Sequence, residues 1–223
     1  MNRESWDWAT IGPLLEQASY ETLYMVAVAT GFTVLFGLPL GVLLVVTGRD
    51  GLLPAPTVNR VLGAVVNVTR SLPFIILLVA LIPVTRAIIG TTIGSAAAIV
   101  PLTIGAVPFF ARLVESALRE VDRGVVDAAV SMGASRRRIV TRVLLPEALP
   151  SLVAGITVTV IALVGYSAMA GAVGGGGLGD LAIRYGYQRF QTDVTIATVV
   201  LLVALVQFVQ VIGDRAARLL NHK

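Results

Sequence analysis

Long uncharged stretches alternate with polar ones along this chain, and the uncharged stretches are long enough to cross a membrane. The first covers residues 22–48, which is 27 residues without a charge, whereas about 20 apolar helical residues span the hydrocarbon core. Similar stretches predict four further spans, at residues 61–85, 87–111, 150–170 and 194–213. The pattern therefore predicts an all-α membrane protein with five transmembrane helices, in a single domain over residues 1–223.

The second of these spans is the hardest to place. Only 15 uncharged residues separate Arg70 from Arg86, which is roughly 22 Å of helix at 1.5 Å per residue, so the span has to include residues 61–69. Arg70 is then either held by protein or extended toward the inner membrane surface. Pro73 and Pro83 predict that this element is bent.

Glycines and prolines in the first and third spans indicate where helices pack closely or break. The glycines of the first span, Gly31, Gly37 and Gly41, allow the close approach of another helix. We therefore expect the first span to pack against protein on at least one side. In the third span, Pro101 and Pro108 are expected to interrupt the helix.

The fourth uncharged run, residues 148–179, is too long for one straight span. Its end is rich in glycine, and each glycine costs about 1 kcal/mol in a helix relative to alanine. The helix is therefore expected to end near Ala170, and the glycines at 174–177 are expected to form an outer loop. Because neither a lysine nor a helix is expected after them, they do not form a phosphate-binding loop. The polar stretch that follows carries aromatic residues typical of a membrane interface, Tyr185, Tyr187 and Phe190.

Basic residues are divided unequally between the two sides of this topology. Thirteen of the 17 lie on the side of residues 112–147, and four lie on the other side. Because Lys and Arg are enriched in cytoplasmic loops, the residues 112–147 and the carboxyl terminus are predicted to be cytoplasmic and the amino terminus to be outside. The same asymmetry explains the pI of about 10.0 without a nucleic-acid partner.

The polar segment at residues 112–147 is far longer than a connection between spans requires, since two to eight residues suffice. It holds seven of the basic and five of the acidic residues. Helical spacing places a set of apolar residues on one face, Val125, Val126, Ala129 and Met132. Gly133 can end this helix in the left-handed conformation, and a second helical stretch is expected from Ser135 toward Pro146. The segment therefore presents a small apolar knob in basic surroundings.

The knob resembles a known signature, (E/D)-A-A-x-x-x-G followed by Leu-Pro, which marks the permease subunits of bacterial ABC importers. Asp127 stands where that family usually has Glu. The resemblance implies that the segment is a coupling helix that docks on a separate ATP-hydrolysing subunit. The residues implied in this coupling are Val126, Asp127, Ala128, Ala129, Met132, Gly133, Ala134 and Pro146. The alternative is an interfacial cytoplasmic loop without a partner.

Two further stretches, at residues 163–179 and around Arg70–Pro73, resemble the permeases of bacterial methionine importers. The resemblance implies the type I ABC importer fold and a homodimer of permeases in the bacterial cell membrane. It also implies two cytoplasmic ATPases, which bind ATP and Mg²⁺, and an extracytoplasmic methionine-binding lipoprotein. No cofactor is expected in the chain itself. A permease for another small amino acid or an organic ion stays open as an alternative.

The fourth span contains the residues expected to line or close the translocation pathway, Gly165, Tyr166, Ser167 and Met169. Small residues thin this helix so that two copies can approach each other. Ser167 and Met169 point about 200° apart, so both cannot face the same partner. Met169, a large pliable side chain among small ones, is either a plug of the closed pathway or an ordinary packing residue.

Composition excludes several other functions. The chain is 56% hydrophobic and 13% charged, whereas soluble domains carry about 25% charged residues, so it is expected to lie in membrane lipid. The sequence has no cysteine, and its one histidine is His222, so no metal site is expected. The spans lack the interior carboxylate or histidine that a secondary transporter needs, which makes that class a remote alternative. Ser167 likewise lacks a base to activate it, so no catalytic residue is expected.

Overall fold

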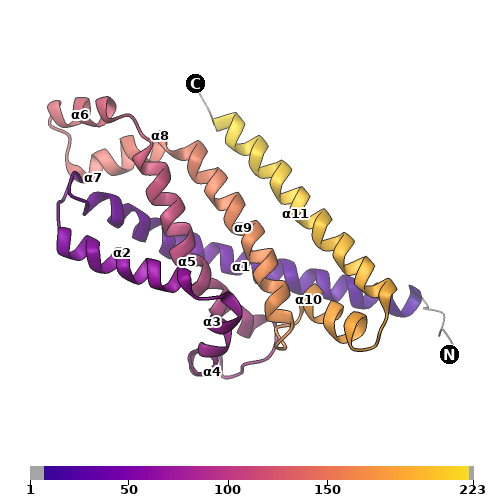
Figure 1. The fold of residues 1–223 in the computed structure, drawn as a ribbon. Coiled ribbons are helices and arrows are strands. Elements are labelled where there is room, and N and C mark those ends of the chain that lie inside the picture. The colour runs from indigo at the N-terminus through magenta and orange to yellow at the C-terminus, as the bar shows by residue number, and fades with distance from the viewer. Residues whose placement is uncertain (1–7, 221–223) are drawn as a thin grey trace. The chain divides into compact units, whose positions relative to one another are not determined.

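The computed structural model describes residues 8–220, and every regular element in that range is a helix (Figure 1). The elements are α1 (Trp8–Val46), α2 (Pro56–Ser71), α3 (Phe74–Ala80), α4 (Ile82–Ile89), α5 (Ser95–Arg119), α6 (Arg123–Ser131), α7 (Arg136–Ile139), the π-helix η1 (Val140–Leu144), α8 (Leu145–Glu147), α9 (Leu149–Gly171), α10 (Gly177–Leu181), the π-helix η2 (Ala182–Tyr187) and α11 (Thr192–Leu220). The all-α class predicted from the sequence is confirmed. Arg3, Trp6 and His222 lie outside the described residues.

Within residues 8–220, four helices are long and apolar enough to cross a membrane: α1, α5, α9 and α11. A fifth crossing requires α2 and α3 to count as one span, and these two helices meet at an angle of 104°. The span expected at residues 61–85 is therefore a broken element. Pro73 lies at the break, where its fixed φ and missing N–H prevent a continuous helix. Arg70, in the last turn of α2, is exposed.

The helices differ in their bounds from the approximate spans expected for them, and the breaks expected at Pro101 and Pro108 were wrong. Among the described residues, the first helix starts at Trp8, well before residue 22, and the last runs on to Leu220. The third expected span, 87–111, is displaced: α5 runs from Ser95 to Arg119, so its last two turns fall in the segment expected to be a loop. Pro101 and Pro108 do not interrupt α5. In contrast, α9 (Leu149–Gly171) lies within one residue of the range predicted for it.

The chain divides into two compact units. Unit 1 comprises residues 1–30, 74–103 and 160–208, and unit 2 comprises residues 31–73, 104–159 and 209–223. By sequence, unit 2 carries 13 of the 17 basic residues and unit 1 carries four. The charge asymmetry that predicted the sidedness of the loops therefore follows the same division as the packing. Whether residues 1–223 act as one domain stays a prediction.

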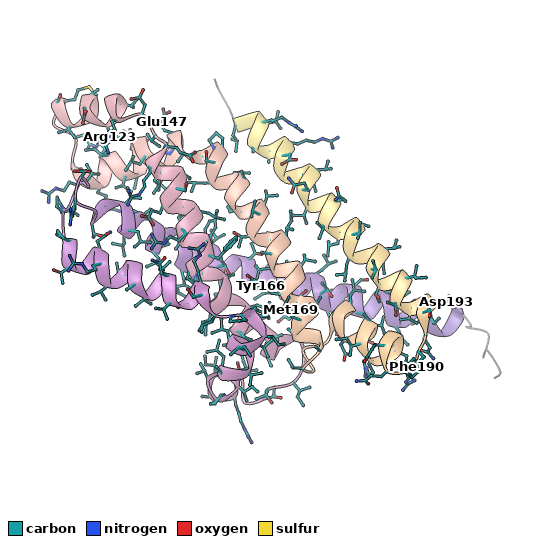
Figure 2. The ribbon with its side chains drawn as sticks, viewed as in Figure 1. Arg123, Glu147, Tyr166, Met169, Phe190 and Asp193 are labelled. Carbon is teal, nitrogen blue, oxygen red and sulfur yellow. The ribbon has the colours of Figure 1, made fainter. Side chains whose placement is uncertain are left out.

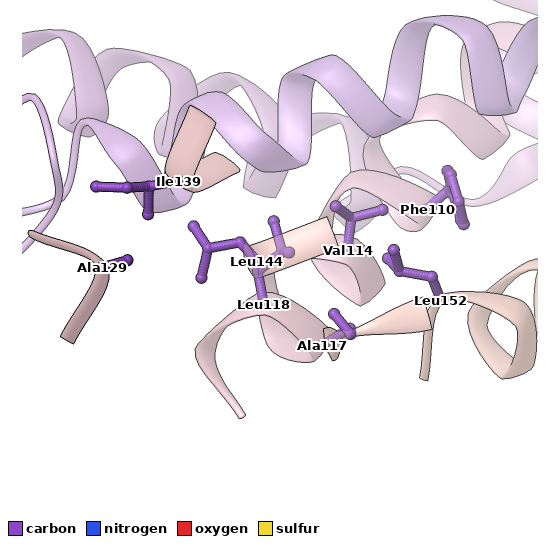
Figure 3. Packing of buried hydrophobic residues seen from close by; sticks show 9 residues of the cluster. Phe110, Val114, Ala117, Leu118, Ala129, Ile139, Leu144 and Leu152 are labelled. Atoms are coloured by element: carbon purple, nitrogen blue, oxygen red, sulfur yellow. The ribbon is translucent and has the colours of Figure 1, made fainter. Parts of the chain in front are cut away.

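The core of unit 2 joins the carboxyl-terminal part of α5 to the polar segment. Its buried residues, drawn as sticks in Figure 3, are Phe110, Val114, Ala117, Leu118, Ala129, Ile139, Leu144, Ala148 and Leu152. They come from α5, α6, α7, η1, α9 and the turn between α8 and α9, and the side chains labelled in the figure gather in one cluster. The polar segment is therefore not a free loop, because its two helical stretches share a hydrophobic core with a membrane-spanning helix.

Close packing of α1 on α5 within unit 2 depends on two glycines. A Cβ at Gly41 would lie 2.5 Å from Cβ of Val114 and 2.6 Å from the carbonyl oxygen of Ala111. At Gly37 it would lie 2.9 Å from the ring of Phe110. Real Cβ atoms do not approach a backbone oxygen as closely as at Gly41, so that position requires glycine, whereas a Cβ at Gly37 would require the ring of Phe110 to shift. The prediction that the first span packs against protein is confirmed.

We therefore expect Gly41→Ala to destabilise the protein by about 1–3 kcal/mol, the usual cost of an overpacked contact. Gly31→Ala is the matched control, because a Cβ there has nothing within 4 Å and alanine favours helix. Thermal unfolding of the two purified variants in detergent measures the difference. Equal melting temperatures would contradict the close approach of α1 and α5.

Unit 1 is held by polar contacts from α1 to the residues after the glycine-rich loop. Oε2 of Glu21 accepts a hydrogen bond from the N–H of Gly177 at 2.8 Å, and Oγ1 of Thr22 accepts one from the N–H of Leu178 at 2.9 Å. The loop is also tied to the start of α5, since the N–H of Gly94 donates to the carbonyl of Gly174 at 2.8 Å. Below these contacts, Ala18, Leu178, Leu181 and Val194 form a small buried core.

Candidate functional site

The first half of the polar segment is a short helix with a defined start and a defined end. Asp122 caps α6, where its side chain accepts a hydrogen bond from the N–H of Gly124 at 2.7 Å. At the other end, Gly133 has φ of 75°, and the N–H of Ala134 donates to the carbonyl of Ala129 at 3.1 Å. This is the left-handed helix ending that the sequence predicted for Gly133. The ending fixes the direction in which the chain leaves α6.

The sequence pattern predicted that the apolar residues of α6 share one face, but in the structure they face different ways. Ala129 is buried in the core of unit 2 and Val126 is half-buried against it, so these two hold α6 to its own chain. Met132 is 81% exposed, and Val125 is also exposed. Ala128, between them on the helix, is exposed as well. The expectation that one face carries all the apolar residues outward is therefore wrong.

Val125 and Ala128 on the exposed side of α6 and Met132, the residue after its end, lie at i, i+3 and i+7. We call these three residues the docking patch, after the role that the resemblance predicts for this segment. Asp127 is exposed beside the patch. The three consecutive arginines that begin α7, Arg136, Arg137 and Arg138, are also exposed. A small apolar surface with charged neighbours is a surface that a partner can cover and recognise.

The second half of the polar segment is helical from Arg136 to Glu147. Figure 2 labels Glu147, and it also labels Arg123 at the start of α6. The helical stretch predicted toward Pro146 is thus confirmed. Its middle part, η1, is a π-helix, where the N–H of Leu145 donates to the carbonyl of Val140, five residues earlier. Pro146 explains this, since it has no N–H and its ring would collide with the carbonyl four residues before it. Ala134, before this stretch, is half-buried and packs against the core of unit 2.

The residues expected on the pathway fall on opposite sides of α9. Met169 is 48% exposed, and Gly165, one turn earlier, is exposed on the same face. Ser167 is 1% exposed, and its hydroxyl donates to the carbonyl of Val164 at 2.8 Å. The ring of Tyr166 stacks on the ring of Phe74 from α3, with centroids 4.4 Å apart. Figure 2 labels Tyr166 and Met169 on α9. The predicted separation of Ser167 and Met169 is confirmed.

Of the four residues expected on the pathway, only the exposed ones can contact a substrate or a second copy of the chain. Ser167 bonds within α9 itself, and Tyr166 joins α9 to α3 through its stacking on Phe74. Gly165 and Met169 offer a small residue and a flexible apolar one, one turn apart on the exposed face. Their part in a pathway stays a prediction.

A short helix, α10, follows the glycines, which corrects the expectation that no helix does. Gly176 and Gly177 have φ of 77° and 76°. A Cβ at Gly179 would lie 2.3 Å from the carbonyl oxygen of Ala168, so α10 packs directly on the end of α9 (Figure 1). The first N–H groups of α10 are already bonded to Glu21 and Thr22. This helix start is therefore filled by the chain's own side chains and not open to a phosphate.

A cavity of about 20 Å³ lies in unit 1 beside the end of α9 and is lined by residues such as Leu78, Thr85, Ala98, Ala170 and Val173. This volume holds about one water molecule. An amino acid does not fit there without movement of the surrounding helices.

Sequence reasoning missed an ionic cluster at the carboxyl-terminal end of α5. Glu115 is 7% exposed and forms ion pairs with Arg112 and Arg119. Arg112 also contacts α2, where it donates to the carbonyl of Gly63 and to Oδ1 of Asn67. The i, i+3 and i, i+4 spacing of the three charges signalled the pairs. The partners on α2 gave no signal, because they lie 45 and 49 residues away.

Comparison with known proteins places this geometry in context. Residues 37–223 match the family described as the inner membrane component of binding-protein-dependent transport systems. The chain is 57% identical over 94% of its length, and 93% of the relative's, to a probable D-methionine transport system permease protein of Vibrio cholerae serotype O1. It is 47% identical, over 94% of each chain, to a methionine import system permease protein of Bacillus subtilis.

Solved structures agree with these matches. A chain of the MetNI methionine ABC transporter, in a structure of its inward-facing conformations, superposes with a TM-score of 0.94 at 49% identity and covers 97% of this chain and 100% of its own. An amino acid ABC transporter matches with a TM-score of 0.78 at 19% identity, over 96% of this chain and 99% of its own, which shows a shared fold.

Proposed function

Because the chain belongs to the family of inner membrane components of binding-protein-dependent transport systems, we propose that it is the membrane-spanning permease of an ATP-driven methionine importer. The observation that carries this proposal is the likeness over nearly the whole chain to permeases named for D-methionine or methionine transport. It includes the segment of the docking patch and the helix of Met169. The chain is a transport subunit, and ATP is hydrolysed by a separate partner.

The coupling of hydrolysis to transport takes place at the docking patch in this proposal. Met132 and its neighbours on α6 enter a groove of the ATP-binding subunit, which also holds the ATP and Mg²⁺. The buried Ala129 and Ile139 make α6 and α7 part of one core with α5. A displacement of the docked helix is therefore passed to a membrane-spanning helix rather than absorbed by a flexible loop.

The remaining partners follow from the same proposal. A second copy of the chain completes the pathway, two ATP-binding subunits dock in the cytoplasm, and an extracytoplasmic methionine-binding lipoprotein delivers the substrate. An importer for another small amino acid is the second candidate, because the small cavity in unit 1 and the exposed face of α9 carry no group that selects methionine.

Reconstitution into liposomes with the ATPase and lipoprotein encoded for the same system tests the substrate. We expect uptake of labelled methionine that depends on ATP and is competed by unlabelled methionine but not by histidine or glutamine. ATP-dependent uptake of another amino acid in preference to methionine would leave the permease assignment standing and overturn the substrate.

We also propose that the docking patch faces the cytoplasm, which the division of basic residues between unit 1 and unit 2 supports. In this cysteine-free chain, a cysteine at the exposed Ser135 is expected to resist membrane-impermeant maleimide in intact cells. A cysteine at Tyr187, which is 76% exposed, is expected to react. Tyr187 is preferable to the outer glycines, since a Cβ at Gly176 would collide with Glu21. The opposite labelling pattern would invert the topology and exclude docking of a cytoplasmic ATPase.

A further inference from the structure

Arg112 bridges two helices of unit 2 at the end of α5. One nitrogen of its guanidinium group, Nη1, donates to Oε2 of Glu115 at 2.5 Å. The other, Nη2, donates to Oδ1 of Asn67 at 2.9 Å and to the carbonyl of Gly63 at 3.2 Å. Gly63 and Asn67 are one turn apart on α2, so a single side chain holds one face of that helix. We call these contacts the Arg112 clamp.

The clamp is more specific than a surface ion pair. The side chain of Glu115 is only 10% exposed, and that of Arg112 is 26% exposed. Both oxygens of the Glu115 carboxylate are engaged, since Arg119 donates to Oε1 at 2.8 Å. The planar fork of Arg112 is thereby held in one orientation, pointing at α2, and a partly buried, charge-assisted pair of this kind keeps its geometry better than an exposed one.

The opposite face of α5 belongs to the core shared with the polar segment. Val114, Ala117 and Leu118 pack there with Ala129 of α6 and Ile139 of α7. On a helix with 100° per residue these positions lie about 120–160° from Arg112. The end of α5 therefore contacts α6 and α7 of the polar segment, which is the coupling segment of the proposed function, on one side and holds α2 by the clamp on the other.

The chain continues from α2 through Pro73 into α3, whose first residue Phe74 stacks on Tyr166 of α9. Each step in this series is a contact within one unit or a covalent connection. A displacement of α2 can therefore be transmitted through α3 to α9, the helix that carries Met169.

We propose that the Arg112 clamp transmits the movement of the coupling segment from α5 to α2, with Arg112 as a positioning residue for transport. This inference rests on the proposed function. A clamp that merely stabilised the fold would affect unfolding and leave the coupling of hydrolysis to uptake unchanged. A transmitting clamp affects the coupling even where the fold is intact.

Asn67→Ala is the decisive variant, because Asn67 is exposed on α2 and its loss leaves the Arg112–Glu115 pair in place. Asn59→Ala is the matched control on the same helix. The amide of Asn59 donates to the carbonyl of Leu44 at 2.6 Å and to Oγ1 of Thr47 at 3.0 Å, so it ties α2 to the end of α1 and not to α5. Asn67→Ala removes one hydrogen bond of an asparagine amide on α2, and Asn59→Ala removes two.

The measurement is the number of ATP molecules hydrolysed per methionine taken up by the complete transporter in liposomes. We expect Asn67→Ala to raise this ratio about 2- to 30-fold, the range for residues that modulate coupling between sites, with the melting temperature unchanged. Asn59→Ala is expected to lower the melting temperature and keep the ratio. Arg112→Lys, which retains the charge beside Glu115 but not the fork, is expected to behave like Asn67→Ala.

The transmitting role would be overturned if Asn67→Ala had the same ATP-to-methionine ratio as the unmodified transporter. It would also be overturned if Asn59→Ala raised this ratio as much as Asn67→Ala does. The unmodified complex is measured first. If it fails to take up methionine, the proposed substrate is at fault. If the unmodified complex takes up methionine and the Asn67→Ala complex is equally well coupled, the transmitting role of the clamp is excluded and the proposed function stands.

Discussion

Gly133→Val is expected to lower transport roughly 5- to 150-fold while the chain still inserts into the membrane, because the residue has φ of 75°. Valine is β-branched and rarely adopts this conformation. A Cβ at this position has nothing within 4 Å, so the effect comes from the backbone and not from a collision. The strain is relieved by unwinding the last turn of α6, which displaces Met132 from the docking patch.

Gly133→Asn is the control for this prediction, since asparagine tolerates the left-handed region. We expect it to keep most of the transport activity. Co-purification of the ATP-binding subunit with each variant, at equal membrane abundance, separates lost docking from lost folding. Normal transport by Gly133→Val would show that the end of α6 does not determine docking.

Met169→Ala is expected to make ATP hydrolysis several-fold less coupled to uptake, or to make the liposomes leak methionine. If two copies of Met169 meet, they form an apolar constriction that polar amino acids do not cross unaided. Because the side chain is 48% exposed in its own chain, its truncation leaves no large cavity there. We therefore expect the melting temperature to change little.

Met25→Ala provides the comparison, because Met25 is 0% exposed and belongs to the same unit. Its loss is expected to destabilise the protein by about 2–5 kcal/mol, the usual cost of a cavity in the core, without uncoupling. Melting temperatures and ATP-to-uptake ratios of the two variants are measured together. A destabilised but tightly coupled Met169→Ala protein would exclude Met169 as a gate.

The sequence was sufficient for the features that depend on local chemistry. Runs of uncharged residues located α9 closely, Gly133 indicated its own left-handed conformation, and Pro73 indicated the break between α2 and α3. Each of these depends on neighbours in the sequence, such as a missing N–H or a φ that only glycine adopts easily. The same reasoning separated Ser167 from Met169, since helix geometry alone sets the angle between them.

Features set by tertiary packing could not be read in this way. The spacing placed Ala129 with Met132, but which of the two faces outward depends on the core of unit 2, in which Ala129 is buried. The extension of α5 to Arg119 was missed because charged residues were taken to end the span. Those charges, Arg112 and Glu115, are stable there since they pair with each other and with α2. Pro101 and Pro108 likewise occur in a helix that its surroundings maintain.

The contact between Glu21 and Gly177 sets a minimum time for the chain to mature. These residues are 156 positions apart, and a ribosome adds about 5–20 residues per second. Gly177 is therefore synthesised about 8–30 s after Glu21. During that interval the first span is in the membrane without the helix that its carboxylate will cap. A membrane chaperone or protease has this period in which to act on the unfinished chain.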